Sequence, residues 1–350
     1  MKKYYDITNL LSTAAQYMIL LGKRANGKSY QVKKTMIEAA YYEGRKMVYL
    51  RRWDRDIKQA LVESYFGDMP VEELTEGNYS GILVYQGELF FYRLDEDGSR
   101  VRGPHVGRAC ALNLAERYKS NTFPDYDYID YEEFITDKAY LPDEPRELQQ
   151  FVSTVARDRD ITVFLVGNTL SRVCPYFAEW CLEGALRQKQ STIEVYHYHR
   201  DDGGTTDIAV ENCSAGQTTS KMFFGQASKQ IISGEWDTVQ VPKLPREQSY
   251  YDVIYELELD FQKFRFCLRL LVDPESGGRI VFVYPMTGSR ALQRRITPDF
   301  SPDPFTTSCL DRRRRPEAYI IECFQIGKVC YSDNLTGADL KNVISNFAFM

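Results

Sequence analysis

The sequence lacks the features of a membrane-bound, secreted or zinc-centred protein. No apolar run approaches the roughly 20 residues of a membrane span, and the first residues, MKKYYDITNL, contain no signal-peptide apolar region. We therefore expect a cytoplasmic chain that does not contact membranes. The eight cysteines form no Cys-x-x-Cys pair, and there are three histidines (His105, His197 and His199), so we expect no zinc site, disulfide framework or catalytic His triad.

An overall excess of positive charge is also missing. The formal net charge is −5, so any surface that binds nucleic acid would have to be local. The chain has 350 residues, of which 43% are hydrophobic and 27% charged. This is enough for two domains of about 150 residues, each with its own core.

The clearest motif is Gly-x-x-x-x-Gly-Lys-Ser, within the stretch ILLGKRANGKSY. Gly22 and Gly27 allow the backbone to curl so that several N–H groups face phosphate oxygens. Lys28 would reach the β- and γ-phosphates of ATP, and the Ser29 hydroxyl would ligate Mg²⁺. Arg24 lies inside the same loop and supplies a further cation.

The residues on either side of the loop fit this role. The apolar run 17–21 predicts a buried strand before it, and the helical spacing of Val32 and Met36 predicts a helix after it that stops at Gly44. A helix N-terminus at this place favours a bound anion. The sequence therefore predicts a P-loop.

Further strands and helices alternate along residues 1–200. Strands are expected at 46–53, 126–134 and 161–168, a helix at 145–160, and an antiparallel hairpin insertion within 81–101. This alternation is typical of an α/β fold, a parallel sheet with helices on both faces.

Three polar residues end two of these strands. Because neighbouring residues of a strand point to different sides, we assign Glu132 to Mg²⁺ and Glu133 to activation of the attacking water. Asn168 can sense the γ-phosphate through a hydrogen bond. Outside a P-loop protein, the same residues would be interpreted as a solvated acidic turn and a turn former.

Phosphoryl transfer also needs a cation that stabilises the transition state. The candidates are Arg24, Lys119, Arg157 and Arg159, and each is otherwise a solvated surface cation. Spacing alone does not choose among them.

After residue 200 the composition changes. Residues 201–240 are rich in Gly, Ser and Thr and predict a linker, and 241–350 predict a separate β-rich α+β domain. Its long β-like runs include 316–332, and 336–347 predict a closing helix. Six arginines in loop-like contexts are candidates for phosphate-backbone contacts, with a solvated charged loop as the alternative; they are Arg294, Arg295, Arg312, Arg313, Arg314 and Arg315.

Several stretches, taken together, resemble the DNA-packaging (encapsidation) ATPases of small podovirus-type tailed phages. They are GKRANGKSY, VYLRRW, YKSN, YIDYEEFI, VARDRD and VGNTLSRVCPYF, in that family's order, within residues 17–177. The resemblance implies an additional-strand, catalytic-glutamate ATPase domain, a short linker domain and a C-terminal RNase H-like domain without nuclease activity.

The resemblance also implies a biological setting. Family members form a ring, expected to have five subunits, at the portal vertex of a procapsid, where ATP hydrolysis drives double-stranded DNA inward. They work in the host cytoplasm, sit on the portal transiently and are absent from the mature virion. The partners implied are DNA, portal, procapsid and, in some members, a structural RNA.

Residue by residue, the resemblance assigns Lys28 and Ser29 to the Walker A pair, Glu132 to the Walker B acid and Glu133 to the catalytic glutamate. Lys119 and Arg157 match basic residues that act on a neighbouring subunit's nucleotide, and Asn168 matches the motif that senses hydrolysis. The family often has Asp where Glu132 stands. The alternatives are another DNA-dependent ATPase, a small-molecule or nucleoside kinase, and an assembly module that binds nucleotide only as a structural ligand.

Overall fold

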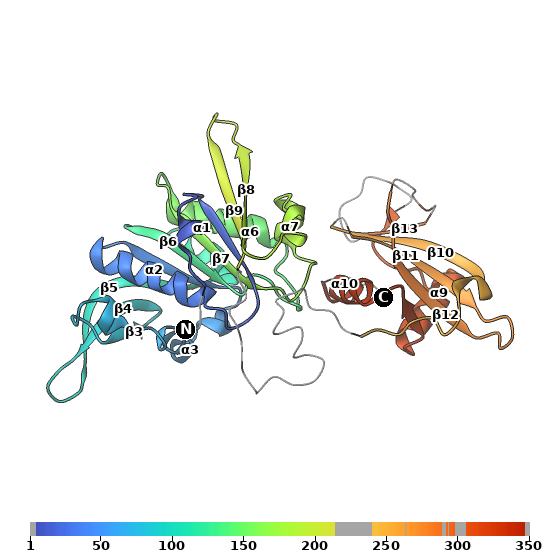
Figure 1. Cartoon of the computed structure of the whole chain (residues 1–350), viewed down its shortest axis with the longest axis horizontal. Coiled ribbons are helices and arrows are strands. Elements are labelled where there is room, and N and C mark those ends of the chain that lie inside the picture. Colours follow the sequence, from blue (N-terminus) through green and yellow to red (C-terminus); the bar gives the residue numbers. More distant parts are fainter. Residues whose placement is uncertain are drawn as a thin grey trace. The chain divides into compact units, whose positions relative to one another are not determined.

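The computed structural model describes residues 5–213, 240–262, 264–288, 292, 294–297 and 306–346. The chain divides into two compact units, shown in Figure 1. The first comprises 1–135, 141–169 and 179–235, and the second 136–140, 170–178 and 236–350. Two short segments that follow strands of the first unit therefore belong to the second.

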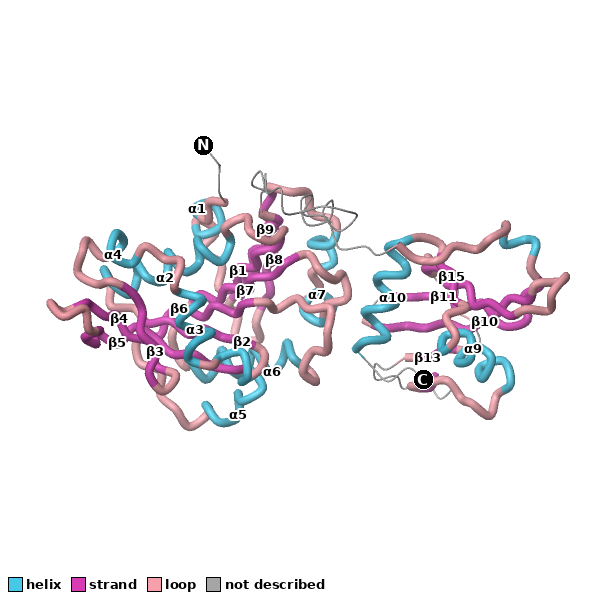
Figure 2. The backbone as a smooth tube through the Cα atoms, turned by 90° about the horizontal axis from the view of Figure 1, so that it is seen from below, coloured by secondary structure: helices cyan, strands magenta, loops and turns pink. Residues whose placement is uncertain are grey.

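The first unit is built on a nine-stranded sheet in the order β3-β4-β5-β2-β6-β7-β1-β9-β8. The strands, seen side by side in Figure 2, are β1 (Tyr17–Gly22), β2 (Lys46–Arg51), β3 (Gly81–Tyr85), β4 (Glu88–Leu94), β5 (Arg100–Ala111), β6 (Tyr126–Glu132), β7 (Thr162–Asn168), β8 (Thr192–His199) and β9 (Thr205–Asn212). The strands from β5 to β9 in this order pair in parallel, whereas β3, β4 and β8 pair antiparallel. The predicted parallel α/β sheet with an antiparallel insertion is confirmed.

Helices cover both faces of this sheet because its central strands are apolar on both sides. In β2, Met47 and Tyr49 pack with α2 and α3, while Val48 and Leu50 are buried on the opposite face, where α6 packs against β6. The helices of this unit are α1 (Thr8–Leu11), α2 (Lys28–Tyr42), α3 (Gln59–Phe66), α4 (Val71–Leu74), α5 (Ala115–Tyr118) and α6 (Glu144–Ala156), with 3₁₀ turns at Asp54–Ile57, Leu112–Leu114 and Glu183–Leu186. The helix α7 (Pro175–Glu179) falls, except for its last residue, in the segment 170–178 of the second unit.

The second unit has a six-stranded sheet in the order β14-β13-β10-β11-β12-β15. Its elements are β10 (Asp252–Phe261), β11 (Phe264–Val272), β12 (Arg279–Pro285), β13 (Arg295–Ile296), β14 (Thr306–Thr307), α9 (Arg315–Gln325), β15 (Val329–Tyr331), α10 (Asn334–Asn346) and a 3₁₀ turn at Gln248–Tyr250. Leu257, Leu268, Val283, Ile320 and Leu340 form part of a single core. The RNase H-like character of this unit stays a prediction.

Two sequence predictions are wrong in detail. The predicted linker 201–240 begins inside the sheet, because β9 pairs with β1 and completes a hairpin with β8; residues 214–239 lie outside the described part. The β-like run 316–332 contains α9, in which Pro316 occupies the first turn and Ile320, Ile321 and Cys323 are buried. Only its end forms β15.

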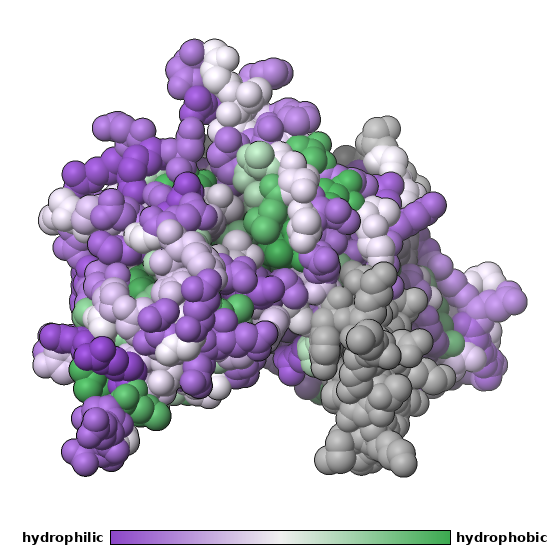
Figure 3. All heavy atoms as spheres, turned by 60° about the vertical axis from the view of Figure 1, so that its left-hand side comes forward, coloured by the Kyte–Doolittle hydropathy of each residue, from purple (hydrophilic) through white to green (hydrophobic). Residues whose placement is uncertain are grey.

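The exposed surface of the described residues is mixed in character. On the face shown in Figure 3, hydrophilic residues predominate and apolar residues form separate patches. Among the described residues, no helix combines the length and the apolar character needed to cross a bilayer.

Candidate nucleotide-binding site

The loop between β1 and α2 has the backbone of an anion-binding turn. Gly22 has φ +149° and Gly27 has φ +101°, conformations that a side chain would strain. A Cβ at Gly22 would lie 3.1 Å from Asn26 Nδ2 and 3.4 Å from the Cys213 carbonyl oxygen. The helix α2 starts at Lys28, so its unpaired N–H groups lie at the loop.

Lys28 is buried inside this loop. Its ammonium donates to the carbonyl oxygens of Gly22 (3.2 Å) and Lys23 (2.8 Å) and to Oδ1 of Asn26 (3.2 Å), and Asn168 Oδ1 lies 3.4 Å away. Burial lowers the pKa of Lys28 to about 8, although nearby groups, Glu132 among them, oppose this shift. A buried cation that has only neutral partners at hydrogen-bond distance fits a phosphate, whose charge would complete its pairing. Arg24, by contrast, is exposed.

Glu132 lies beside the loop, within hydrogen-bond reach of Ser29. Residues 128, 130 and 132 of β6 share the face that α2 and α3 cover. Glu132 is buried and accepts hydrogen bonds from Ser29 and Tyr65; burial raises the pKa of its carboxyl, and these two hydrogen bonds partly offset the shift. A serine hydroxyl that touches a buried carboxylate at a P-loop fits Mg²⁺, because both are oxygen ligands.

Glu133 lies at the same edge of the sheet but makes a different contact. The backbone of Glu133 has φ +58°. Its side chain is 63% exposed and accepts a hydrogen bond from Arg51 Nη2 at 2.7 Å. Arg51 ends β2, the strand next to β6. The structure therefore brings Lys28, Ser29, Glu132 and Asn168 together, and it holds Glu133 at the neighbouring strand end.

A buried ion pair fixes the backbone around Glu133. Arg52 donates to Glu144 through Nε (2.7 Å) and Nη2 (3.0 Å). It also donates to the carbonyl oxygen of Glu133 through Nη1 (3.2 Å) and to that of Phe134 through Nη2 (2.6 Å). Glu144 is fully buried and also accepts from the Tyr131 hydroxyl at 2.6 Å. The first turn of α6 is thereby tied to the end of β2 and to the chain that follows β6.

Arg157 lies at the opposite end of the strands from the P-loop, between the end of α6 and the start of β7. Arg157 is exposed, follows the end of α6 with φ +49°, and donates to the Asn121 carbonyl oxygen at 3.2 Å. Lys119 pairs with Glu116, three residues earlier in α5. The seven residues of β7 separate Arg157 from Asn168, about 20 Å at 3.3 Å per residue. Arg159 is held by Asp127 at 2.8 Å, which makes it a structural residue.

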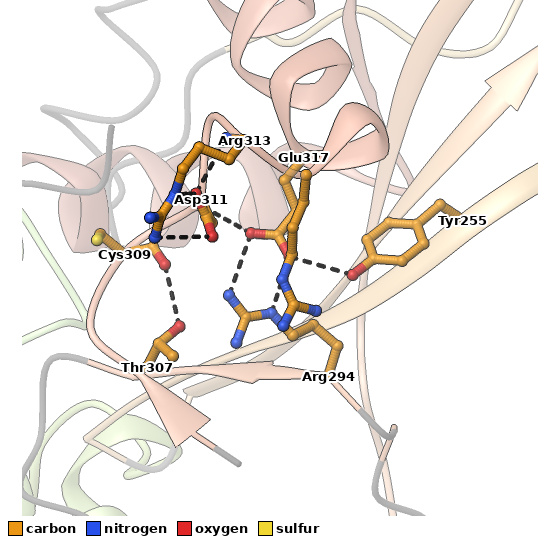
Figure 4. Close-up of polar contacts among 8 residues, drawn as sticks. Tyr255, Arg294, Thr307, Cys309, Asp311, Arg313 and Glu317 are labelled. Carbon is orange, nitrogen blue, oxygen red and sulfur yellow. Dashed lines mark hydrogen bonds and ion pairs between the residues drawn. The ribbon is translucent and has the colours of Figure 1, made fainter. Parts of the chain in front are cut away.

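The six arginines that were candidates for nucleic-acid contact separate into two sets. Figure 4 shows Arg294 bound to the buried carboxylate of Glu317, with Nε 2.9 Å and Nη2 3.1 Å from its oxygens. The side chain of Arg294 is 11% exposed, so the structure corrects its assignment to a nucleic-acid surface. Arg295 is partly exposed and lies 3.9 Å from the buried Glu258.

Arg312, Arg313 and Arg314 lie in the loop before α9, Arg315 is the first residue of that helix, and all four are exposed. Arg313 pairs with Asp311, whose backbone N–H donates to Glu317 at 2.7 Å, as Figure 4 shows. Glu317 also accepts from Tyr255 at 3.2 Å and lies 3.9 Å from Arg314 Nε. One buried carboxylate therefore anchors the loop that exposes these arginines.

Sequence reasoning missed Tyr65, Asp130, Arg51 and the pair Arg52–Glu144. The one available signal was spacing: Asp130 precedes Glu132 by two residues and so shares its face. Within the described ranges, no three His, Cys, Asp or Glu side chains gather closely enough to hold a metal by themselves.

A parallel α/β sheet with a glycine loop, a buried lysine and a serine–carboxylate contact defines the class of P-loop nucleotide-binding proteins. The family model "Podovirus DNA encapsidation protein (Gp16)" matches residues 1–197, more than half of the chain, and the chain belongs to this family.

Individual relatives agree with this membership. The chain is 29% identical over 178 residues to the DNA packaging protein of Bacillus phage phi29, a match that covers 50% of this chain and 49% of that protein. The DNA packaging protein of Bacillus phage B103 is 28% identical over 162 residues, covering 45% and 46%. The chain thus spans about half the length of the curated relatives it matches.

Two solved structures are similar over nearly the whole chain. The bacteriophage Phi-29 viral genome packaging motor assembly matches with a TM-score of 0.58 and 20% identity, covering 97% of both chains. The Phi-28 gp11 DNA packaging motor matches with a TM-score of 0.50 and 15% identity, covering 100% of this chain and 99% of the other. At these identities, the likeness shows the fold.

Proposed function

We propose that this protein is an ATP-hydrolysing motor that drives double-stranded viral DNA into a preformed procapsid. The observation that carries the proposal is the meeting of Lys28, Ser29, Glu132 and Asn168 at one edge of the sheet, in a member of an encapsidation family. Each of these side chains has a role in binding or sensing a nucleoside triphosphate.

In this proposal the loop N–H groups and Lys28 bind the β- and γ-phosphates, and Ser29 and Glu132 hold Mg²⁺, which would neutralise charge on the phosphates. Glu133 orients the attacking water, which requires its carboxylate to leave Arg51. Asn168, at 3.4 Å from the Lys28 ammonium, detects whether the γ-phosphate is present. The exposed Arg24 adds a cation at the mouth of the loop.

Lys119 and Arg157 act on the nucleotide of a neighbouring copy. The place of Arg157, about 20 Å of strand away from its own loop, favours action across a subunit interface. This fits a homo-oligomeric ring, for which we propose five subunits, on the portal of the procapsid. The ring works in the host cytoplasm and is released before the virion matures.

The exposed loop Arg312–Arg315 binds the phosphate backbone of DNA. A motor must hold DNA without reading its sequence, and arginine–phosphate contacts suit that task. Some family members use a structural RNA, and the same loop would bind that backbone. The second unit is proposed to be RNase H-like and inactive as a nuclease.

The central experiment compares Glu133→Gln with the wild type. We expect the variant to bind ATP with unchanged affinity and to lose hydrolysis, because the water loses its base while the phosphate contacts remain. Glu96→Gln, on the exposed β4–β5 connection, is the control and should hydrolyse ATP normally. Hydrolysis by Glu133→Gln at the wild-type rate, or a phosphorylated small-molecule product, would contradict the proposal.

Action between subunits is tested by mixing Arg157→Ala with Lys28→Ala. Each variant alone should be inactive, and the mixture should recover part of the ATPase activity, because some interfaces then combine an intact loop with an intact arginine. Arg146→Ala, a 70%-exposed arginine at the other end of α6, is the control and should be active alone. Absence of recovery in mixed rings counts against the shared site.

DNA binding by the arginine loop is measured through its salt dependence. Replacing all four arginines with glutamine should reduce the slope of log K against log salt by up to roughly 3 to 4, because each phosphate contact contributes about 0.9. Arg246→Gln, a 53%-exposed arginine of the same unit, should leave the slope nearly unchanged. An unaltered slope in the fourfold variant would exclude this loop from the DNA interface.

A further inference from the structure

The hydroxyl of Tyr65 lies between two buried carboxyl groups. Its oxygen is 2.7 Å from Asp130 Oδ2 and 2.9 Å from Glu132 Oε1. Both carboxyl groups come from the same face of β6, and Tyr65 reaches them from α3, a helix that follows β2. One atom on a separate element therefore bridges the two acids.

The ring of Tyr65 is held on several sides, so its hydroxyl has a fixed position. Tyr49 stacks on it with centroids 4.5 Å apart and an interplanar angle of 28°. The Lys33 ammonium lies 4.5 Å from the ring centroid and also donates to the Tyr65 carbonyl oxygen at 2.6 Å. Lys33 belongs to α2, the helix that begins at the P-loop.

Asp130 anchors the hydroxyl from the other side. Its side chain is fully buried, and its Oδ1 has no hydrogen-bond partner within the part of the chain that the structure describes. Among the described residues, Tyr65 alone forms a hydrogen bond with the Asp130 carboxyl group. Without the hydroxyl, two buried acids would face each other across the space it fills, an arrangement that disfavours their charged forms.

We propose that Tyr65 is a positioning residue that holds the carboxylate of Glu132 in place for the metal, with Asp130 as its anchor. The inference rests on the proposed role of Glu132 as the Mg²⁺ carboxylate. Glu132 is then fixed by two hydroxyls, Ser29 from the loop and Tyr65 from α3. Partners that orient a metal-binding carboxylate in this way typically contribute about 10- to 100-fold to metal affinity or activity.

The test is Tyr65→Phe, which keeps the stacked ring and removes one oxygen. Metal affinity is measured from the electron paramagnetic resonance signal of free Mn²⁺, titrated in the presence of a non-hydrolysable ATP analogue. We expect about 10- to 100-fold weaker binding of Mn²⁺ and unchanged binding of the analogue in EDTA. The matched control is Tyr128→Phe, on the same strand and face, whose ring stacks on Phe164; it should bind Mn²⁺ as the wild type does.

Two further variants separate the possible results. Asp130→Ala leaves Tyr65 intact and should weaken Mn²⁺ binding in the same direction, which keeps the test available if Tyr65→Phe fails to fold. Wild-type Mn²⁺ affinity in folded Tyr65→Phe overturns the inference. If Glu132→Gln weakens Mn²⁺ binding in that case, the proposed metal site survives; if Glu132→Gln also binds normally, the proposed role of Glu132 fails as well.

Discussion

The buried pair Arg52–Glu144 offers a sharp test of the structure around the site. Glu144 accepts hydrogen bonds from Arg52 through two nitrogens, from the Tyr131 hydroxyl at 2.6 Å and from the Leu141 backbone N–H at 2.8 Å. Its side chain is fully buried and that of Arg52 is 7% exposed. Glu144→Gln keeps the size of the side chain but removes the negative charge of this pair, while Arg52 stays charged and buried.

Breaking a buried ion pair on one side costs about 3 to 5 kcal/mol. In a unit of this size, that loss corresponds to a fall in melting temperature of roughly 6 to 20 °C. Thermal and urea unfolding, followed by circular dichroism, measure it on the full chain. Activity should fall as well, because Arg52 also holds the carbonyl oxygens of Glu133 and Phe134.

The matched control is the pair Arg146–Asp143, at the start of the same helix. Both side chains are more than half exposed, so Asp143→Asn should cost no more than about 1 kcal/mol. If Glu144→Gln destabilises the chain no more than Asp143→Asn does, the buried pair is not the tie between α6 and β2 that the geometry indicates.

Other predictions concern separate parts of the chain. Gly27→Ala should weaken ATP binding, measured by titration calorimetry, because φ +101° strains any side chain; unchanged affinity would show that the loop tolerates the change. Arg159→Ala should lower the melting temperature and Arg157→Ala should not, because only Arg159 is paired with a carboxylate. Burial raises the pKa of Asp339 to about 6, against the opposing effect of Arg172. The Asp339 carboxyl therefore binds its proton more tightly in the native state than in the unfolded state. This protonation stabilises the native state fully below about pH 4, and the stabilisation is lost as the pH rises through 6. Between pH 4 and 7, the free energy of unfolding of Asp339→Asn, measured with urea, should rise by about 3 kcal/mol relative to that of the wild type. If the difference between the two proteins does not change with pH, the raised pKa of Asp339 is refuted.

Local patterns were sufficient for the part of the site that lies near the P-loop. The glycine spacing fixed the positions of Lys28 and Ser29, and the alternation of β6 separated Glu132 from Glu133. The run 316–332 was misassigned because Tyr, Ile and Val favour strands when counted alone. Two features of this run indicate a helix more reliably. Pro316 is suited to a first helical turn, and the buried residues Ile320, Ile321 and Cys323 have helical spacing.

What the sequence could not supply are contacts between elements that are far apart along the chain. Arg294 and Arg312 occupy equally loop-like stretches, and they differ because only Arg294 reaches the buried Glu317, 23 residues away. Tyr65 lies 67 residues before Glu132 in the sequence, on helix α3. The hydrophobic pattern of that helix does not indicate a contact with a carboxylate. Such contacts depend on how helices pack across strands, so the contact of Tyr65 with Asp130 and Glu132 can be recognised only when the positions of β6 and α3 are known.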